Sequence, residues 1–302
     1  MKLELKIPDG FLEETRTEFI VASKTKELWA VQLDLLAKID SICRKYGIRY
    51  SIDSGTLIGA MRHGGFIPWD DDIDVIMPRL DYDRFSKIVS GEIGGDYFFQ
   101  NWKNSPGYYR AFGRLLNIRT SAIAKGDLVR GRSMWKYPQG VFVDILIVDN
   151  IPDDDSLREE HFRKLHHLYI KYWVARSYVA YFNNFTRLKI TLGGLHKFVL
   201  GAVLRLLGLL GFNLIDRWFA AFNSELERYN DQSTECGAPY TNRPYEILKL
   251  CEFDNLVDVK FEFLKVKAFG NYDSILKQQY GDWRRHVIGA RAPIIYDIKE
   301  VL

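Results

Sequence analysis

Four aspartates lie within one short segment of this chain, directly before an apolar run. They are Asp70, Asp71, Asp72 and Asp74, and the run Asp72-Ile73-Asp74-Val75-Ile76 is typical of the start of a buried β-strand. Alternate residues of a strand project from the same face, so Asp72 and Asp74 are expected to lie side by side. Two neighbouring carboxylates beside apolar residues repel each other unless a cation joins them. The segment therefore predicts a metal site.

A hard divalent ion with oxygen ligands suits such a site. Mg²⁺ commonly binds one or two carboxylates together with substrate phosphates and water, and Mn²⁺ accepts similar ligands. We therefore expect Asp72 and Asp74 to bind Mg²⁺, with Mn²⁺ as the substitute. The chemistry is expected to involve phosphate.

The composition indicates a globular protein without an overall attraction to nucleic acid. The chain has 302 residues, 47% hydrophobic and 27% charged, and its net charge is only +3. Cys43, Cys236 and Cys251 are far apart in the sequence and are interpreted as free thiols in a reducing cytoplasm. The first eleven residues lack the continuous apolar run of a signal peptide, so we expect a cytoplasmic protein.

The pattern of apolar residues predicts an α+β fold, with a mixed α/β sheet core in the first half and a largely helical second half. Apolar positions recur every three or four residues from Leu28 to Tyr46, which predicts a helix ending at Gly47. Further helices are expected near 56–63, after Pro78 and over 272–283, and strands over 48–52, 72–76, 97–99, 109–116 and 141–148. We divide the chain into a catalytic core (1–155), a helical region (156–255) and a C-terminal segment that returns to the core (256–302).

Residues 195–215 are strongly apolar, and Lys197 and Arg205 interrupt the run. A spanning helix needs ~20 predominantly apolar residues with few charges, so we do not expect a transmembrane segment. Two interpretations are open. The first and favoured one is a buried core helix, and the second is an interfacial helix that makes a peripheral membrane contact.

A turn from strand to helix carries Gly55 and Thr56, ahead of the aspartates. A glycine at such a turn lets backbone N–H groups approach a ligand, and a helix N-terminus favours an anion. Gly55 and Thr56 are therefore candidates for binding a phosphate, while a plain helix cap is the structural alternative.

A third carboxylate is expected, because phosphoryl transfer needs a group that accepts a proton or holds a second ion. Asp144 is the best candidate, since it stands alone in an apolar strand where an unpaired carboxylate is costly. A buried salt bridge is the alternative. Asp149, near the end of that strand, is interpreted as a turn residue.

Six further residues near these positions have weaker assignments. Asp71 is expected to orient the metal ligands, and Asp70 to belong to the turn into the strand. Arg62 and His63 are candidates for contact with phosphate. The structural alternatives are a surface cation for Arg62 and a capping residue for His63. Arg114, with Arg110 on the same face of a predicted strand, is a candidate clamp for a diphosphate, and an exposed face of the sheet is the slightly favoured alternative.

At these residues the chain resembles the LicD family, which is grouped with fukutin-related protein in the nucleotidyltransferase superfamily. The resemblance is carried by Gly55-Thr56-Leu57-Ile58-Gly59-Ala60, by Arg62-His63-Gly64-Gly65-Phe66-Ile67-Pro68-Trp69-Asp70-Asp71-Asp72-Ile73-Asp74, by Met77-Pro78-Arg79, by Val143-Asp144-Ile145 and by Tyr280-Gly281-Asp282. It covers roughly residues 25–155 and 260–285. The tail beyond Trp283 departs from the proline-rich, histidine-containing pattern that family members often carry.

The resemblance implies a nucleotidyltransferase-type sheet in which Asp72, Asp74 and Asp144 bind Mg²⁺. It also implies a CDP-linked donor, commonly CDP-choline or another CDP-alcohol, and an acceptor hydroxyl on a cell-surface glycan such as lipopolysaccharide or teichoic acid. CMP is the expected leaving group. A lipid-linked acceptor would place the protein at the inner face of the cell membrane.

Two other functions are open at this point. One is a nucleotidyltransferase that moves a nucleoside monophosphate to a small acceptor. The other is a catalytically inactive scaffold that binds a glycan or a membrane surface. Choline recognition would need an aromatic cage, and the candidate side chains are Trp102, Tyr108, Tyr109, Trp135 and Tyr137.

Overall fold

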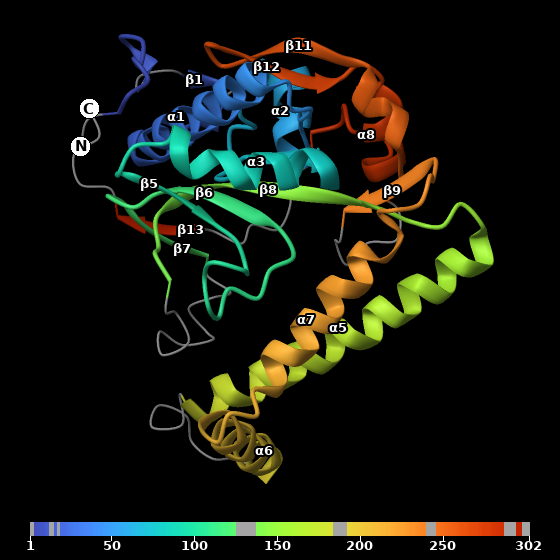
Figure 1. Cartoon of the computed structure of the whole chain (residues 1–302). Coiled ribbons are helices and arrows are strands. Elements are labelled where there is room, and N and C mark those ends of the chain that lie inside the picture. The colour runs from blue at the N-terminus through green and yellow to red at the C-terminus, as the bar shows by residue number, and fades with distance from the viewer. Residues whose placement is uncertain are drawn as a thin grey trace.

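One long strand, β8 (Val141–Asn150), organises the sheet in this computed structural model (Figure 1). The structure describes residues 3–11, 15–16, 19–124, 137–183, 192–239, 246–286 and 294–297. On one edge of β8 lies β4 (Asp74–Pro78), which runs parallel to it. On the other edge, β6 (Gly113–Asn117) pairs antiparallel with the first half of β8 and β9 (Cys236–Pro239) with its end.

The remaining strands of this sheet extend it at its edges. Strand β3 (Ser51–Ile52) pairs antiparallel with β4, and β5 (Tyr97–Gln100) pairs antiparallel with β6. Strand β10 (Leu248–Lys249) pairs antiparallel with β9. The sheet is therefore mixed, and the expected α+β class is confirmed.

Three helices from the first third of the chain pack against the sheet (Figure 1). They are α1 (Ser23–Tyr46), α2 (Ser54–His63) and α3 (Arg79–Glu92), all at the expected places. Leu28, Leu35 and Ile39 of α1 are fully buried, as the periodicity predicted, whereas Tyr46 at its end is 36% exposed. Both α1 and α2 end at a glycine in the left-handed conformation, Gly47 (φ 60°) and Gly64 (φ 66°), where a side chain on Cβ would be strained.

The expected strands differ from the observed ones in two places. The strand expected over 48–52 is reduced to the two residues of β3, and the strand expected over 109–116 begins only at Gly113. Arg110 therefore lies in the preceding loop and not on the same strand face as Arg114. The interpretation of Asp149 as a turn residue is wrong, because it lies inside β8 and is buried against Arg79.

The second half of the chain contains a helical extension that projects from the sheet (Figure 1). Its helices are α5 (Asp155–Asn183), α6 (Leu192–Leu209) and α7 (Leu214–Leu226), followed by the 3₁₀ turn η4 (Glu227–Tyr229). Helices α5 and α7 run side by side around a small apolar core of Leu165, Tyr172, Phe219, Phe222 and Leu226. Helix α6 lies at the far end, and β9 then returns the chain to the sheet.

The favoured interpretation of residues 195–215 as a buried core helix is wrong. Leu206, Leu209 and Leu210 are 57%, 71% and 64% exposed. In the part of the chain that the structure describes, no single helix is long and apolar enough to cross a membrane, although α6 and α7 together pass that test as a pair bent by 85°.

The C-terminal part returns to the core. It comprises η5 (Leu250–Asp254), the hairpin strands β11 (Leu256–Phe261) and β12 (Leu264–Phe269), α8 (Tyr272–Tyr280) and β13 (Ile294–Asp297), which pairs with β7 (Ser121–Ala124). A separate pair near the N-terminus is formed by β1 (Thr15–Arg16) and β2 (Phe19–Ile20).

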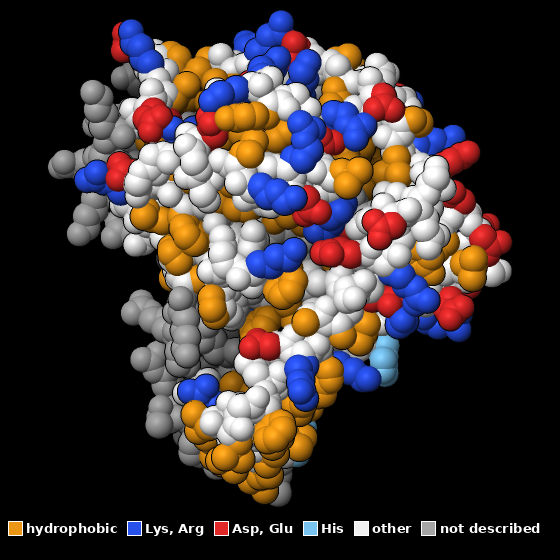
Figure 2. All heavy atoms as spheres, in the orientation of Figure 1, with side chains coloured by type: hydrophobic (Ala, Val, Ile, Leu, Met, Phe, Trp, Pro, Cys, Tyr) orange, Lys and Arg blue, Asp and Glu red, His pale blue; other side chains and the backbone are white. Residues whose placement is uncertain are grey.

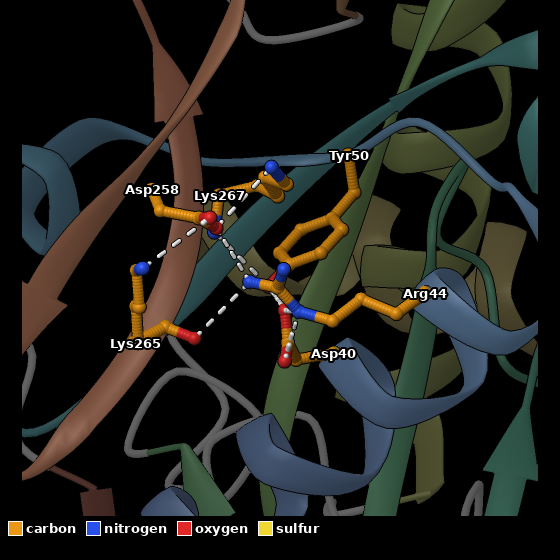
Figure 3. A network of polar contacts seen from close by, with 6 residues as sticks. All are labelled: Asp40, Arg44, Tyr50, Asp258, Lys265 and Lys267. Atoms are coloured by element: carbon orange, nitrogen blue, oxygen red, sulfur yellow. Dashed lines mark hydrogen bonds and ion pairs between the residues drawn. The ribbon is translucent and has the colours of Figure 1, made fainter.

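Polar contacts tie this hairpin to α1 (Figure 3). The Arg44 guanidinium contacts both Asp40 of α1 (2.8 Å) and Asp258 of β11 (2.6 Å). The Tyr50 hydroxyl donates to Asp40 (2.6 Å) and accepts from the backbone N–H of Lys267 (3.3 Å). The hairpin is thus held against the helix that supports the acidic segment.

Candidate active site

Asp74 and Asp144 lie on neighbouring strands and face each other in register. Asp74 opens β4, Asp144 is the fourth residue of β8, and the two are direct partners in the parallel pair. Neighbouring strands are about 4.8 Å apart, and paired positions project from the same face of a sheet. The ladder continues one step before β4, since the Asp144 N–H donates to the Ile73 carbonyl (3.0 Å). Two carboxylates distant in the sequence are therefore neighbours.

Asp72 belongs to the same acidic group, together with Asp70 and Asp71. Carboxylate oxygens of these three residues lie within 4.8 Å of one another, a group within the described chain that could hold a metal ion. Helix α1 fixes this segment, because Trp29 donates to the Asp70 carbonyl (2.9 Å) and Gln32 to the Asp71 carbonyl (2.8 Å). The expected pair is thus part of a larger acidic set, in which the predicted turn residue Asp70 takes part.

The electrostatics of this set fit a cation. Burial raises the pKa of Asp72 well above its usual range, and the charges of Asp70 and Asp144 add to the effect. Burial likewise raises the pKa of Asp74, with further contributions from Asp72 and Asp144. These carboxylates repel one another and are poorly hydrated, which is the condition that a hard divalent ion with oxygen ligands relieves.

Gly55 and Thr56 lie in the first turn of α2, next to the acidic segment. The buried Thr56 hydroxyl accepts a hydrogen bond from the backbone N–H of Asp74 (2.9 Å) and so connects α2 to the start of β4. A Cβ on Gly55 would lie 2.7 Å from an oxygen of Asp70, so a side chain at this position would require the Asp70 carboxylate to move. Their expected role in binding phosphate stays a prediction.

Asp53 is a site residue that sequence reasoning missed. It precedes α2 and is 2% exposed, and within the described chain its Oδ1 atom has no hydrogen-bond partner. Burial, and then the nearby Glu246, raise the pKa of Asp53 to about 6. An aspartate before a helix normally caps it, whereas this one makes no capping bond. The available signal was its place two residues before Gly55.

Arg114 reaches the site by pairing with Asp144. The two residues are register partners between β6 and β8, and the guanidinium binds both carboxylate oxygens (Nε–Oδ1 2.5 Å, Nη2–Oδ2 3.3 Å). The guanidinium also stacks 3.6 Å from the ring centroid of Phe142. A carboxylate has about four lone-pair positions, so Asp144 keeps acceptor capacity beside this pair. The alternative expected for Asp144, a buried salt bridge, is thus present as well.

Tyr108 is a second missed contributor. It is 1% exposed, and among the described residues its hydroxyl has no hydrogen-bond partner. Burial raises the pKa of Tyr108, and Arg114 and Asp144 both act on the phenol electrostatically. Its ring packs edge-on against Tyr137 at 5.6 Å. Two of the aromatic residues considered for a choline cage therefore lie together near Asp144, while Trp135 lies outside the described residues.

Arg62 and His63 contact the C-terminal segment in the part of the chain that the structure describes. They occupy the last turn of α2, and Arg62 donates to the carbonyls of Trp283 and Arg285 (3.1 Å each) and to His63 (3.0 Å). The His63 ring lies 5.3 Å from that of His286. These residues hold the C-terminal segment against α2. The tail from 287 to 293 lies outside the described residues.

A known protein family matches the segment that carries this site. Residues 47–148 match the family model described as LicD/FKTN/FKRP, nucleotidyltransferase domain. The matched range begins at Gly47 and ends inside β8, so it includes α2, β4 and the acidic residues described above.

Three relatives are similar to parts of this chain. The lipopolysaccharide cholinephosphotransferase LicD of Haemophilus influenzae is 37% identical over 134 residues, which is 44% of this chain and 47% of that protein. An uncharacterised protein of Rickettsia prowazekii is 49% identical over 55 residues, 18% of this chain and 21% of that protein.

The human ribitol 5-phosphate transferase FKRP is 40% identical over 48 residues, 16% of this chain and 10% of that protein. Each match thus spans less than half of the relative's own length. Over residues 47–148 the chain is thus similar to the nucleotidyltransferase domain of the LicD/FKTN/FKRP family.

Proposed function

We propose that this protein transfers a phospho-alcohol, most simply phosphocholine, from a CDP-linked donor to a sugar hydroxyl of a cell-surface glycan or its precursor. The observation that carries the proposal is the pairing of Asp74 with Asp144 across β4 and β8, beside Asp72. The names of the LicD and FKRP relatives support both the transferred group and the glycan acceptor. The reaction releases CMP.

We assign Asp72, Asp74 and Asp144 to Mg²⁺, or to Mn²⁺ in its place, with Asp70 and Asp71 next to them. The bound ion would offset charge on the donor diphosphate and on the leaving CMP. The mutual repulsion of these carboxylates supports the assignment, because it is a stability cost that a cation would remove.

The residues around the carboxylates have separate tasks in this proposal. The first turn of α2, with Gly55 and Thr56, presents backbone N–H groups to the donor diphosphate. Arg114 orients Asp144 and offers a positive charge to the same phosphates. Tyr108 supplies a hydroxyl at the edge of this group.

The transfer itself is a displacement at the distal phosphorus. The sugar hydroxyl forms the new P–O bond as the bond to the CMP oxygen breaks, and the hydroxyl proton passes to Asp144 as general base. Because Arg114 occupies only part of the acceptor capacity of Asp144, the carboxylate can stay oriented while it accepts the proton.

We place this reaction in the cytoplasm, at the inner face of the cell membrane. A glycan precursor carried on a lipid would be presented there. The exposed apolar side chains of helix α6 support this location.

The test uses CDP-choline labelled in the choline or in the cytidine, with Mg²⁺ and a glycan acceptor. Choline label on the glycan, with release of CMP, is the expected result. Cytidine label on the acceptor would instead identify nucleoside monophosphate transfer.

Asp72→Ala and Asp74→Ala proteins, with Asp96→Asn as the matched surface control, identify the catalytic set. Asp96 pairs with Arg119 on the surface, so its change should leave transfer intact. If the wild type shows no transfer of either label, and glycan binding survives both alanine changes, the protein is a scaffold and the proposal is wrong.

A further inference from the structure

Helix α6 and the turn that follows it expose an unusual amount of apolar surface at the tip of the helical extension (Figure 2). The side chains concerned are about half exposed or more, and they are Leu195, Val199, Leu200, Val203, Leu206, Leu209, Leu210 and Phe212. Contiguous exposed apolar patches are rare on soluble proteins and usually mark a binding surface. We call this set the α6 patch.

One edge of α6 is already packed, and the α6 patch is what remains. A Cβ on Gly201 would lie 2.2 Å from the Tyr178 carbonyl oxygen, so α6 approaches α5 at van der Waals distance along this edge. Phe198 packs on Phe182 with ring centroids 5.1 Å apart. Helix α6 is thus packed against α5 along this edge, and its position does not depend on burying the α6 patch.

The sequence around α6 has a strong charge bias. From His161 to Ile215 there are eight lysines and arginines and no aspartate or glutamate. Because the whole chain carries only +3, the rest of the molecule is net negative. Lys197 and Arg205 lie on α6 itself and are exposed. The apolar patch therefore shares its helix with two exposed positive charges, Lys197 and Arg205, which complement an anionic surface.

The orientation of the helices suits contact with a flat surface. Helices α6 and α7 meet at 85°. Because α6 lies at the tip of the extension, a surface in contact with α6 is separated from the sheet by the length of α5 and α7 (Figure 1).

We propose that the α6 patch docks onto a membrane surface rich in anionic lipids. The apolar side chains enter the boundary between headgroups and acyl chains, and Lys197 and Arg205 lie at the level of the lipid phosphates. A second copy of the chain is a poorer occupant, because a two-fold contact through this patch would set Lys197 and Arg205 near their own counterparts. The proposal does not depend on the transfer reaction, since it concerns different elements.

The test is co-sedimentation of the full chain with vesicles of phosphatidylcholine, with and without phosphatidylglycerol. The wild type should bind the mixed vesicles and bind them less as salt is raised. The Leu206→Gln/Leu209→Gln/Leu210→Gln protein should lose roughly tenfold or more in vesicle affinity. A Lys197→Gln/Arg205→Gln protein should lose the preference for phosphatidylglycerol.

The matched control is Leu80→Gln/Leu157→Gln, which removes apolar side chains that are 68% and 51% exposed outside α6. Its vesicle binding should equal that of the wild type, and thermal unfolding should show that every variant is folded. Equal binding by the leucine triple variant and the wild type, or no wild-type binding to either vesicle, overturns the proposal.

Analytical ultracentrifugation without vesicles addresses the other occupant. A dimer that the leucine triple variant abolishes would assign the α6 patch to a second copy and overturn the membrane proposal, whereas a monomer supports it. Choline transfer to a soluble glycan fragment should persist in this variant. Vesicle binding without any transferase activity would refute the proposed function and leave this inference standing.

Discussion

At the scale of single residues, Asp74 shows how a site can oppose the stability of its own fold. Asp74 is the first residue of the buried strand β4, and it lies beside Asp144 and close to Asp72. Burial, together with the charges of these two carboxylates, raises the pKa of Asp74. Keeping such a group charged without a cation destabilises the folded state. The acidic set is therefore a local weakness of the structure that ligand binding would remove.

Asp74→Asn should make the metal-depleted protein more stable by about 1 kcal/mol or more, because it removes one repelling charge with little change in shape. Transfer activity should fall on the order of 10³-fold. Calorimetry with and without Mg²⁺, together with transfer rates, measures both effects. An unchanged Mg²⁺ response in the variant would contradict the metal assignment.

A different carboxylate, Asp149, is satisfied by the protein itself. Arg79 binds both of its oxygens (2.7 and 2.8 Å), Asn230 donates to it (2.6 Å), and both members of the ion pair are buried. Arg79→Met should cost about 3–5 kcal/mol, because it leaves a buried charge without its partner. Arg119→Met, which breaks the surface pair with Asp96, should cost no more than about 1 kcal/mol.

Denaturant unfolding of these proteins tests the comparison. The double variant Arg79→Met/Asp149→Leu should recover part of the loss, since it removes the unpaired charge as well. Similar decreases in the free energy of unfolding from Arg79→Met and Arg119→Met would show that the buried ion pair stabilises the fold no more than the surface pair does.

At the scale of elements, the packing of α2 leaves no room for a larger side chain at Gly59. A Cβ on Gly59 would lie 2.4 Å from the Gly65 carbonyl oxygen and 3.1 Å from the Ile67 nitrogen, so the helix rests directly on the chain that leads to the acidic segment. The same helix carries Gly55 and Thr56 at its start. A shift of α2 therefore displaces the aspartates as well.

Gly59→Ala should destabilise the protein by about 2–4 kcal/mol and reduce transfer activity, because backbone atoms must move to admit the methyl group. Gly91→Ala, in α3, is the control. Its new Cβ meets nothing within 4 Å, and alanine favours a helix, so no loss of stability is expected. Thermal unfolding compares the two, and equal melting temperatures would contradict the packing argument.

Elements whose signals are local could be predicted from the sequence, whereas contacts between elements could not. The ends of α1 and α2 followed from Gly47 and Gly64, and β8 from its unbroken apolar run. The pairing of Arg114 with Asp144 depends on the register of β6 with β8, which no pattern within either strand contains. The exposure of α6 was missed for a related reason, since apolar composition does not say which helix faces remain uncovered.

Asp53 and Tyr108 illustrate the same limit within the site. Each has a polar atom that is buried by residues from other elements, and burial of that kind arises only when the chain has folded. Asp72, Asp74 and Asp144 were found because a carboxylate in an apolar strand is anomalous in the sequence itself.

At the scale of the whole molecule, the loop between β5 and β6 connects the helical extension to the site. Trp102 and Tyr109 pack against Phe219 of α7 with ring centroids 5.9 and 5.4 Å apart, and the Tyr109 hydroxyl donates to Asp216. Tyr108, the neighbour of Tyr109, faces the Arg114 and Asp144 pair. The position of the helical extension is therefore linked to the side of the site where Tyr108 lies.

The base of the extension contains a pH-sensitive junction. His161 of α5 is 3% exposed, and its Nδ1 lies 3.3 Å from Glu225 of α7, which also pairs with Lys164 (2.6 Å) and Arg228 (3.2 Å). Burial lowers the pKa of His161 despite the nearby carboxylate. Burial alone would raise the pKa of Glu225, but its bonds to Lys164, Arg228 and His161 outweigh burial and lower it.

Both shifts make the folded protein less stable in acid. The unfolded chain takes up a proton at His161 as the pH falls below the ordinary imidazole value of about 6.5, before the folded protein does, so stability falls with pH in that window. Glu225 adds a further loss at lower pH, as the pH falls from its ordinary value through the lowered one. Thermal unfolding between ~pH 7.5 and ~pH 5 should therefore show a falling melting temperature, and His161→Gln should flatten the upper part of this slope. His166→Gln, an exposed histidine on the same helix, should leave the slope unchanged, and a slope that His161→Gln does not alter would remove His161 as its source.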